Sequence, residues 1–209
     1  MIKYMENSIV ISVNNILCNL YRNGNINKAV LASARHAVSM ASPQAQSVWP
    51  VMMAELQKPM LSQNGEPTYA EIATYAAVRL YAIHQQSTDT CVYSSSFNQY
   101  NEKPEGLSLF AALASLRQIE DARVALDRRV QPLLATTNVN SVINSLTHLV
   151  AILKVSQRTC KIDYARLADD LFHFQMSYEQ ANRVRLNWGR QYFYSINKSI
   201  KTQSEGKKN

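Results

Sequence analysis

Apolar residues recur every three or four positions along most of the chain. This spacing places them on one side of an α-helix, whereas the side chains of a strand alternate at every second residue. No stretch of useful length alternates in that way, so we expect no β-strand. The helical pattern predicts segments at about residues 5–22, 26–40, 67–86, 108–117, 121–135, 138–157, 163–175 and 178–200, with a further helix that contains Trp49. The predicted fold is all-α, a compact helical protein of about nine helices in two small helical bundles.

Local signals mark where several of these helices begin. Ser42 and Pro43 suit the N-cap and first turn of the helix that contains Trp49, and Pro50 could kink that helix or mark a later start. Asp163 is a predicted N-cap, and Ser177 followed by Gln180 fits a capping box. The helix opened by Pro67 carries a predicted apolar stripe of Tyr69, Ile72, Ala76, Leu80 and Ile83.

The stretch from residue 89 to residue 106 breaks the helical pattern. It is polar and Ser-rich, and Pro104 and Gly106 close it, which predicts a long loop or linker. It separates a predicted N-terminal helical domain, residues 1–88, from a predicted C-terminal basic helical domain, residues 107–200. Residues 201–209 form a predicted disordered tail.

Composition favours a folded chain in a reducing compartment. Apolar residues make up 46% and charged residues 18% of the sequence, and there are only five glycines and six prolines, which argues against disorder. Three cysteines without a C-x-x-C pair suggest reduced thiols and a cytoplasmic location. The N-terminus lacks the features of a signal peptide. Residues 130–153 contain no charged side chain but are too polar to span a bilayer, so we expect no membrane segment.

The net charge of +7 is unevenly placed. Residues 1–104 contain seven Lys or Arg and six Asp or Glu, whereas residues 105–209 contain fifteen and nine. The second half therefore carries a charge of +6. A local basic excess is typical of a polyanionic partner, and a solvated basic surface without any ligand is the alternative.

The segment "RVRLNWGRQYF" at 183–193 places cations opposite a buried face. On a helix from 178 to 200, Trp188 falls on the apolar side as a predicted core anchor. Arg185 lies on that side too, where a salt bridge or a subunit contact is expected. Gly189 should cost about 1 kcal/mol relative to Ala, which suggests close approach of another backbone. The opposite side carries a stripe suited to phosphates and unpaired bases: Arg183, Asn187, Arg190, Tyr194 and Lys198.

The other helices carry outward cations as well. For each of them a solvated surface is the alternative to a binding role. Arg123 and Asp127 are spaced to pair along one helix. The positions that the helical pattern turns away from the core, or to its edge, are Lys28, Arg35, Arg128, Arg129, Lys154 and Arg158.

The sequence gives little support for a catalytic function. Asp169, Asp170 and His173 lie within one helical turn and could offer metal ligands, but no second cluster accompanies them. The sequence has no G-x-S-x-G motif, P-loop or dinucleotide-binding fingerprint. We expect no catalytic residue, no metal and no cofactor.

An ordered set of segments carries a family resemblance. The most specific of them are "AAVRLYAIHQQ" (76–86) and "VRLNWGRQYF" (184–193). The others are "LASARHAV", "SVWPVMMAEL", "GLSLFAALASL", "DRRVQPLLAT", "LTHLVAILK" and "IDYARLADDLFHF". Together they cover roughly residues 28–194, and over this span the chain resembles the CasB family, the small subunit of type I-E CRISPR Cascade.

The resemblance implies a non-catalytic, all-helical subunit of an RNA-guided antiviral complex. It implies two copies packed head to tail beside other Cascade subunits, with no membrane. It also implies contacts with crRNA, target DNA and the displaced single strand that show little sequence preference, because guide pairing reads the sequence. By motif position, it assigns nucleic-acid contacts to Arg35, Arg128, Arg129 and Arg190. The helical pattern alone adds Lys28, Lys154, Arg158, Arg183 and Lys198.

Two other function classes stay open at this point. One is a helical protein–protein interaction subunit that has no direct contact with nucleic acid. The other is a small metal-dependent hydrolase that uses Asp169, Asp170 and His173.

Overall fold

The structure is a computed structural model that describes residues 2–97 and 104–205, with the side chains of residues 2–7, 23 and 195–205 left out. Across this part of the chain there are nine α-helices and no named strand, which confirms the predicted all-α fold. The helices are α1 (Ile2–Leu20), α2 (Lys28–His36), α3 (Trp49–Glu55), α4 (Tyr69–Gln85), α5 (Leu109–Leu116), α6 (Glu120–Ala135), α7 (Val139–Ser156), α8 (Tyr164–Met176) and α9 (Tyr178–Glu205).

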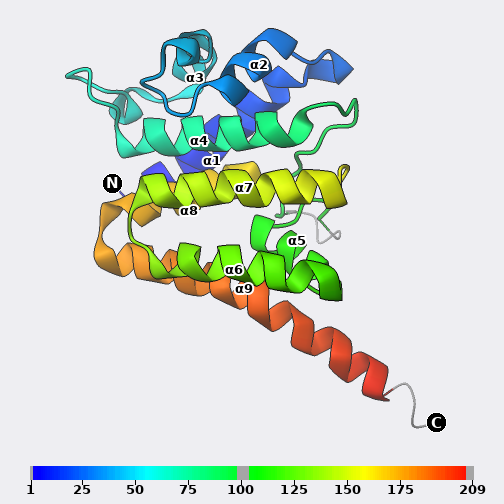
Figure 1. Cartoon of the computed structure of the whole chain (residues 1–209). Coiled ribbons are helices and arrows are strands. Elements are labelled where there is room, and N and C mark those ends of the chain that lie inside the picture. The colour runs from blue at the N-terminus through cyan, green and yellow to red at the C-terminus, as the bar shows by residue number, and fades with distance from the viewer. Residues whose placement is uncertain (1, 98–103, 206–209) are drawn as a thin grey trace.

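The helices form two layers (Figure 1). In the front layer α2, α4, α7 and α6 lie side by side in that order, and in the back layer α1, α8 and α9 do the same. α4 packs on α8, α6 packs on α9, and α5 packs on α9 and α7. We use "front layer" for α2, α4, α7 and α6, and "back layer" for α1, α8 and α9.

Polar side chains fix the starts of several helices. The Asp163 carboxylate accepts a hydrogen bond from the Arg166 amide at 2.9 Å, which confirms this residue as the N-cap of α8. The Ser177 hydroxyl accepts one from the Gln180 amide at 3.2 Å, as the predicted N-cap of α9 should. Thr68 begins α4 with a complete capping box.

The expected helix opening at Ser42 and Pro43 is wrong, and the later start that Pro50 could mark is confirmed. These residues begin a separate 3₁₀ turn, Pro43–Ser47, and α3 begins only at Trp49. The reason is Pro50, whose missing N–H and fixed φ are tolerated only in the first turn of an α-helix. A continuous helix from residue 43 would place that proline in its interior.

The central helix α4 is buried on nearly all sides. Fourteen of its seventeen residues are buried, because α1, α2, α7 and α8 all pack against it. The predicted apolar stripe holds for Ala76 and Leu80, but Tyr69 is 52% exposed at the helix start. A one-sided stripe is therefore the wrong description of this helix.

The segment between the two predicted domains, where it is described, pairs with residues 161 and 162 just before α8. The Ile162 amide donates to the Val92 carbonyl at 2.9 Å, and the Leu107 amide donates to the Lys161 carbonyl at 2.9 Å. A Cβ on Gly106 would lie 2.0 Å from the Ser94 carbonyl oxygen, so only glycine fits there. Residues 98–103 lie outside the described residues. The division at residues 88 and 107 stays a prediction about which segments fold as units.

Two further expectations concern α9 and α7. α9 continues to Glu205, and residues 206–209 of the predicted disordered tail lie outside the described residues. α7 is long and apolar enough to cross a membrane by length and composition alone. Its apolar side faces the other helices, with these residues buried: Val142, Leu146, Leu149, Val150 and Leu153.

Candidate nucleic-acid interface

Four of the predicted contacts gather around the C-terminal end of α4. α4 and α7 lie side by side with their C-terminal ends together, and α2 flanks that end from the other side (Figure 1). Lys154 Nζ donates to Gln86 Oε1 at 2.8 Å, and Arg35 Nη1 donates to the Ala82 carbonyl at 3.4 Å. We call the four cations the α4-end cluster: Lys28, Arg35, Lys154 and Arg158.

These cations are close enough to act on one another. Burial lowers the pKa of Lys154 from its ordinary value, and repulsion from Arg158 and Arg35 lowers it further. Lys28 and Arg35 line one pocket with Gln86, and Asp89 is the acidic residue beside them. Among the described residues no ion pair involves any of the four cations. Like charges held together without paired counter-ions create a positive field that a polyanion would neutralise.

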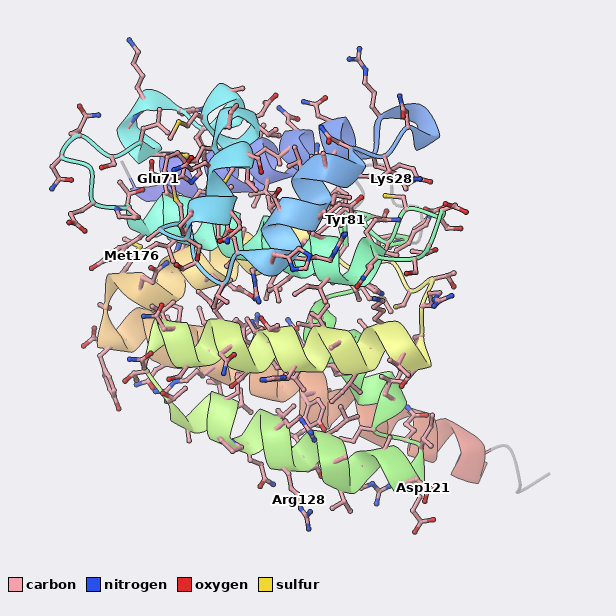
Figure 2. The ribbon with its side chains drawn as sticks, turned by 45° about the horizontal axis from the view of Figure 1, so that its top comes forward. Lys28, Glu71, Tyr81, Asp121, Arg128 and Met176 are labelled. Atoms are coloured by element: carbon pink, nitrogen blue, oxygen red, sulfur yellow. The ribbon has the colours of Figure 1, made fainter. Side chains whose placement is uncertain are left out.

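Arg128 and Arg129 lie further along the front layer, on α6. Both are exposed, and Arg129 Nη1 donates to the Ala125 carbonyl at 3.0 Å. Arg129 also lines a shallow pocket with His148 of α7. Figure 2 shows Lys28 on α2 and Arg128 on α6, with the rest of the front layer between them. Five of the nine predicted cations therefore lie on helices of the front layer, and Arg158 lies in the turn that follows α7.

The remaining three predicted cations, Arg183, Arg190 and Lys198, lie on α9 in the back layer. The helical pattern is confirmed on the inner side, where Val184, Trp188 and Tyr192 are buried. On the outer side Arg183 and Arg190 are exposed, while the Lys198 side chain lies outside the described residues. Apolar side chains accompany these cations, since Leu186 is 69% and Phe193 is 39% exposed. We call this region the α9 outer surface: Arg183, Leu186, Arg190, Phe193 and Tyr194.

The expected approach of a backbone at Gly189 is not found among the described residues, and Arg185 hydrogen-bonds to groups of its own chain. A Cβ on Gly189 would lie 3.6 Å from Leu134 Cδ1, which is an ordinary side-chain contact, so the expected approach of another backbone is wrong within this chain. Arg185 Nη1 donates to the Leu134 carbonyl at 3.2 Å, and its Nη2 bonds to Asn182 Oδ1. A cation suits this place because carbonyls at a helix C-terminus carry partial negative charge.

Asp127 has a different partner from the one that helical spacing suggests. Its two carboxylate oxygens accept from Arg117 Nε at 2.7 Å and Nη2 at 3.1 Å, and the Tyr192 hydroxyl donates to it at 2.7 Å. The expected pair between Arg123 and Asp127 is wrong, because a residue from the end of α5 reaches the same carboxylate with better geometry. The missed residue Arg117 also lies 5.1 Å from the Phe193 ring centre.

The candidate metal ligands take part in packing between helices α8 and α9. Asp170 Oδ2 accepts from Trp188 Nε1 at 2.6 Å, and Asp169 lies 3.7 Å from His173 Nδ1 and 3.8 Å from Arg166 Nη1. Within the described ranges no three His, Cys, Asp or Glu residues are placed to hold a metal ion together. Asp170 therefore has a structural partner in the core anchor of α9.

The fold and its surfaces define an all-helical protein whose basic side chains come together from several helices. The chain belongs to the family of CRISPR-associated protein Cse2, which matches residues 30–193. It is similar to the crystal structure of CasB from Thermobifida fusca, with a TM-score of 0.62 and 25% sequence identity, over 90% of this chain and 96% of that one. No curated protein matches it. The resemblance to the CasB family is confirmed, and the chain is a CRISPR Cascade subunit.

Proposed function

We propose that this Cascade subunit binds nucleic acid without sequence specificity and stabilises the R-loop of a type I-E complex. The observation that carries the proposal is the α4-end cluster, where cations from α2 and from the end of α7 lie together without paired carboxylates. Phosphate contacts of this kind give affinity but read no bases. Since exchange of one duplex for another is nearly balanced in free energy, modest contacts to the crRNA–target heteroduplex and the displaced strand shift it.

The front layer supplies the main contact surface in this proposal. The α4-end cluster holds the phosphate backbone, and Arg128 and Arg129 extend the surface along α6. Arg183, Arg190 and Lys198 provide a second, less dense set on α9. The subunit acts without catalysis and works in the cytoplasm beside the other Cascade subunits.

A protein contact is the better assignment for part of the α9 outer surface. Leu186 and Phe193 are exposed next to Arg190, and exposed apolar side chains among cations are typical of subunit contacts. We assign its apolar side chains, Leu186 and Phe193, to a contact with a second copy of the chain or with another subunit. On α9 an interaction role thus lies beside the nucleic-acid contacts of Arg183 and Arg190.

R-loop formation by the assembled complex tests the proposal. The double variant Lys28→Ala/Arg158→Ala removes two exposed cations whose side chains have no hydrogen bond among the described residues, so the fold should be unaffected. We expect it to enter the complex normally and to form fewer R-loops, with the deficit largest at low salt and shrinking as salt is raised.

The matched control is Lys58→Ala/Arg166→Ala, which removes two exposed cations that lie outside the front layer. It should form R-loops as the unmodified subunit does. Equal R-loop yields from both double variants would overturn the assignment to the front layer. Single-stranded DNA that fails to bind the isolated chain even at low salt would favour a pure interaction subunit.

A further inference from the structure

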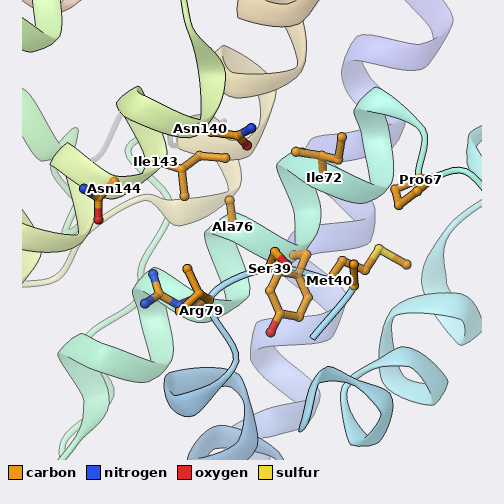
Figure 3. A pocket seen from close by; sticks show the side chains of 12 residues that line it. Ser39, Met40, Pro67, Ile72, Ala76, Arg79, Asn140, Ile143 and Asn144 are labelled. Atoms are coloured by element: carbon orange, nitrogen blue, oxygen red, sulfur yellow. The ribbon is translucent and has the colours of Figure 1, made fainter. Parts of the chain in front are cut away.

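A cavity of about 320 Å³ lies between α4, α7 and the segment 38–41 (Figure 3). It lies along the N-terminal halves of α4 and α7, whereas the α4-end cluster lies at their C-terminal ends. Its walls are mostly apolar: Val38, Met40, Pro67, Ile72, Ala76 and Ile143. Its polar lining consists of Ser39, Asn140, Asn144 and Arg79 together with the Tyr75 ring and its hydroxyl.

Arg79 is a buried cation without a counter-ion among the described residues. It is 8% exposed, its Nη1 donates to Thr147 Oγ1 at 2.7 Å, and its Nε has no hydrogen-bond partner there. Burial lowers the pKa of Arg79 from its ordinary value, and the only opposing influence comes from Tyr75. That tyrosine is neutral, because burial raises its pKa to about 12 and its hydroxyl donates to the Ala37 carbonyl. A guanidinium stays charged in proteins, and the Thr147 hydrogen bond compensates only part of the free energy of burying this charge.

We propose that this cavity receives an acidic side chain of a protein partner, whose carboxylate pairs with Arg79 while a neighbouring apolar side chain fills the remaining space. Charge complementarity supports this occupant, because the planar guanidinium matches the geometry of a carboxylate. The volume lies within the range of ligand pockets, about 300–1,000 Å³.

The apolar walls distinguish a carboxylate side chain from a nucleic-acid phosphate. A phosphodiester brings a charged group attached to polar sugars, and it would leave the aliphatic walls without partners. A Glu or Asp next to an aliphatic residue satisfies both the single cation and the walls. Val38 at the rim is 69% exposed, which extends the apolar contact to the surface of the chain. The inference goes beyond nucleic-acid binding, because it assigns a protein contact to a separate site.

The variant Arg79→Met separates a docking role from a structural one. Met keeps much of the length of the side chain and removes the charge, so the isolated chain should keep its Tm or gain a few degrees. In competition with the unmodified chain, incorporation into Cascade should fall by at least about 10-fold, because one partner of a buried charge pair is lost. Lys58→Met, which removes an exposed cation elsewhere, should change neither quantity.

A lower Tm with unchanged incorporation would overturn the proposal and leave Arg79 as a structural partner of Thr147. Thr147→Val provides the second measurement, because it removes that hydrogen bond and keeps the charge. We expect Thr147→Val to incorporate normally. If both variants lose Tm and incorporation in parallel, the loss follows stability and the docking role is rejected. The salt dependence of single-stranded DNA binding should be the same in Arg79→Met as in the unmodified chain. The docking proposal and the proposed R-loop function can therefore be rejected separately.

A peptide titration identifies the chemistry of the occupant. We would titrate the full chain with N-acetyl-Leu-Glu-amide and N-acetyl-Leu-Gln-amide and follow the Ile143 methyl signals by NMR. Shifts with the glutamate peptide alone, lost in Arg79→Met, are expected. Equal shifts with both peptides, or no shift with either, would overturn the carboxylate assignment. A shift of the same signals with thymidine monophosphate and not with the peptides would assign the cavity to nucleic acid instead.

Discussion

The α4-end cluster and the α9 outer surface are both basic, yet they are built in opposite ways. The cluster joins cations that are distant in sequence, and they lie close enough for Arg35 and Arg158 to lower the pKa of Lys154. On the α9 outer surface Arg183 and Arg190 lie about two turns apart on one helix, and the exposed side chains of Leu186 and Phe193 accompany them. We propose that the density of cations, more than their number, separates a surface for phosphates from a surface for protein.

The helices beneath the two regions, α4 and α9, differ in how much of their surface is buried. α4 is buried on nearly all sides, so the cluster around its end rests on α2 and α7 as well. α9 is amphipathic, and only its inner side is fixed by the core. Changes on the inner side of α9 should therefore act on stability, and changes on its outer side should act on contacts.

The largest expected effect belongs to Trp188→Ala. Trp188 is fully buried, stacks between Phe110 and Phe174, and donates to Asp170. The substitution should lower the free energy of unfolding by about 3–5 kcal/mol, measured by urea denaturation. Tyr194→Ala on the outer side of the same helix is the control, with an expected change within about 0.5 kcal/mol. Similar losses in both variants would contradict the division of α9 into an inner and an outer side.

One buried group beneath each region should make stability depend on pH, and the two dependences should have opposite signs. Burial raises the pKa of Asp170, beneath α9, from its ordinary 3.8 to about 7. The native chain then holds this proton where the unfolded chain has lost it, so stability falls as pH rises from about 4 to 7. Burial lowers the pKa of His84, near the C-terminal end of α4, from 6.5 to about 4. The unfolded chain then binds the extra proton, so this contribution to stability is lost as pH falls from 6.5 to 4.

Single substitutions should reveal these opposing contributions. Asp170→Asn keeps an oxygen that can accept from Trp188 and removes the titration, so the variant should lose stability on acidification. His84→Gln should instead leave a chain that loses stability as pH rises. We expect each effect to be on the order of 3–4 kcal/mol across its window, measured by urea denaturation between pH 4 and 7. The same pH profile in both variants would contradict the assignment of either group.

A third prediction compares the two surfaces directly through the salt dependence of single-stranded DNA binding. Lys28→Ala/Arg158→Ala and Arg183→Ala/Arg190→Ala each remove two positive charges, so net charge is matched. The first should reduce the magnitude of the slope of log K against log salt by about 1.4, as the loss of two phosphate contacts implies. The second should reduce it by less than about 0.7. Equal reductions would show that density does not distinguish the surfaces.

Helix positions and the buried sides of α6, α7 and α9 could be predicted because helical periodicity is local. Leu126, Val130 and Leu133 are buried in α6 as their spacing indicates. The burial of α4 on nearly all sides and the docking of Val92 on Ile162 could not be predicted in this way. Both depend on which distant segments pack together, and spacing within one segment carries no such information.

The residues of the candidate site also divide into those that helical spacing predicts and those that depend on how distant helices pack. The outward orientation of Arg128 and Arg190 follows from the helical pattern, whereas the gathering of Lys28 and Lys154 depends on two helices that flank the end of α4. Arg79 was missed altogether. A signal for it exists, since a cation between Val78 and Leu80 in an otherwise apolar helix indicates a buried charge. The role of each of these five cations stays a prediction until the variants are measured.

The smallest expected effect, Gly189→Ala, sharpens the assignment of the α9 outer surface. A Cβ there would meet Leu134 Cδ1 at 3.6 Å, so the isolated chain should gain stability from the better helix former, by up to about 1 kcal/mol. Gly106→Ala is the opposite control and should lose stability, because its Cβ would lie 2.0 Å from the Ser94 carbonyl oxygen. Thermal unfolding compares the three chains.

The same Gly189→Ala variant can be tested inside the complex. If a neighbouring subunit packs closely on the α9 outer surface, the added methyl group should weaken incorporation although the isolated chain is more stable. A stability gain of the isolated chain that is carried unchanged into the complex would contradict a close protein contact at Gly189. Stability and assembly then change in opposite directions only if the outer side of α9 is a subunit contact, which is the property that distinguishes it from the α4-end cluster.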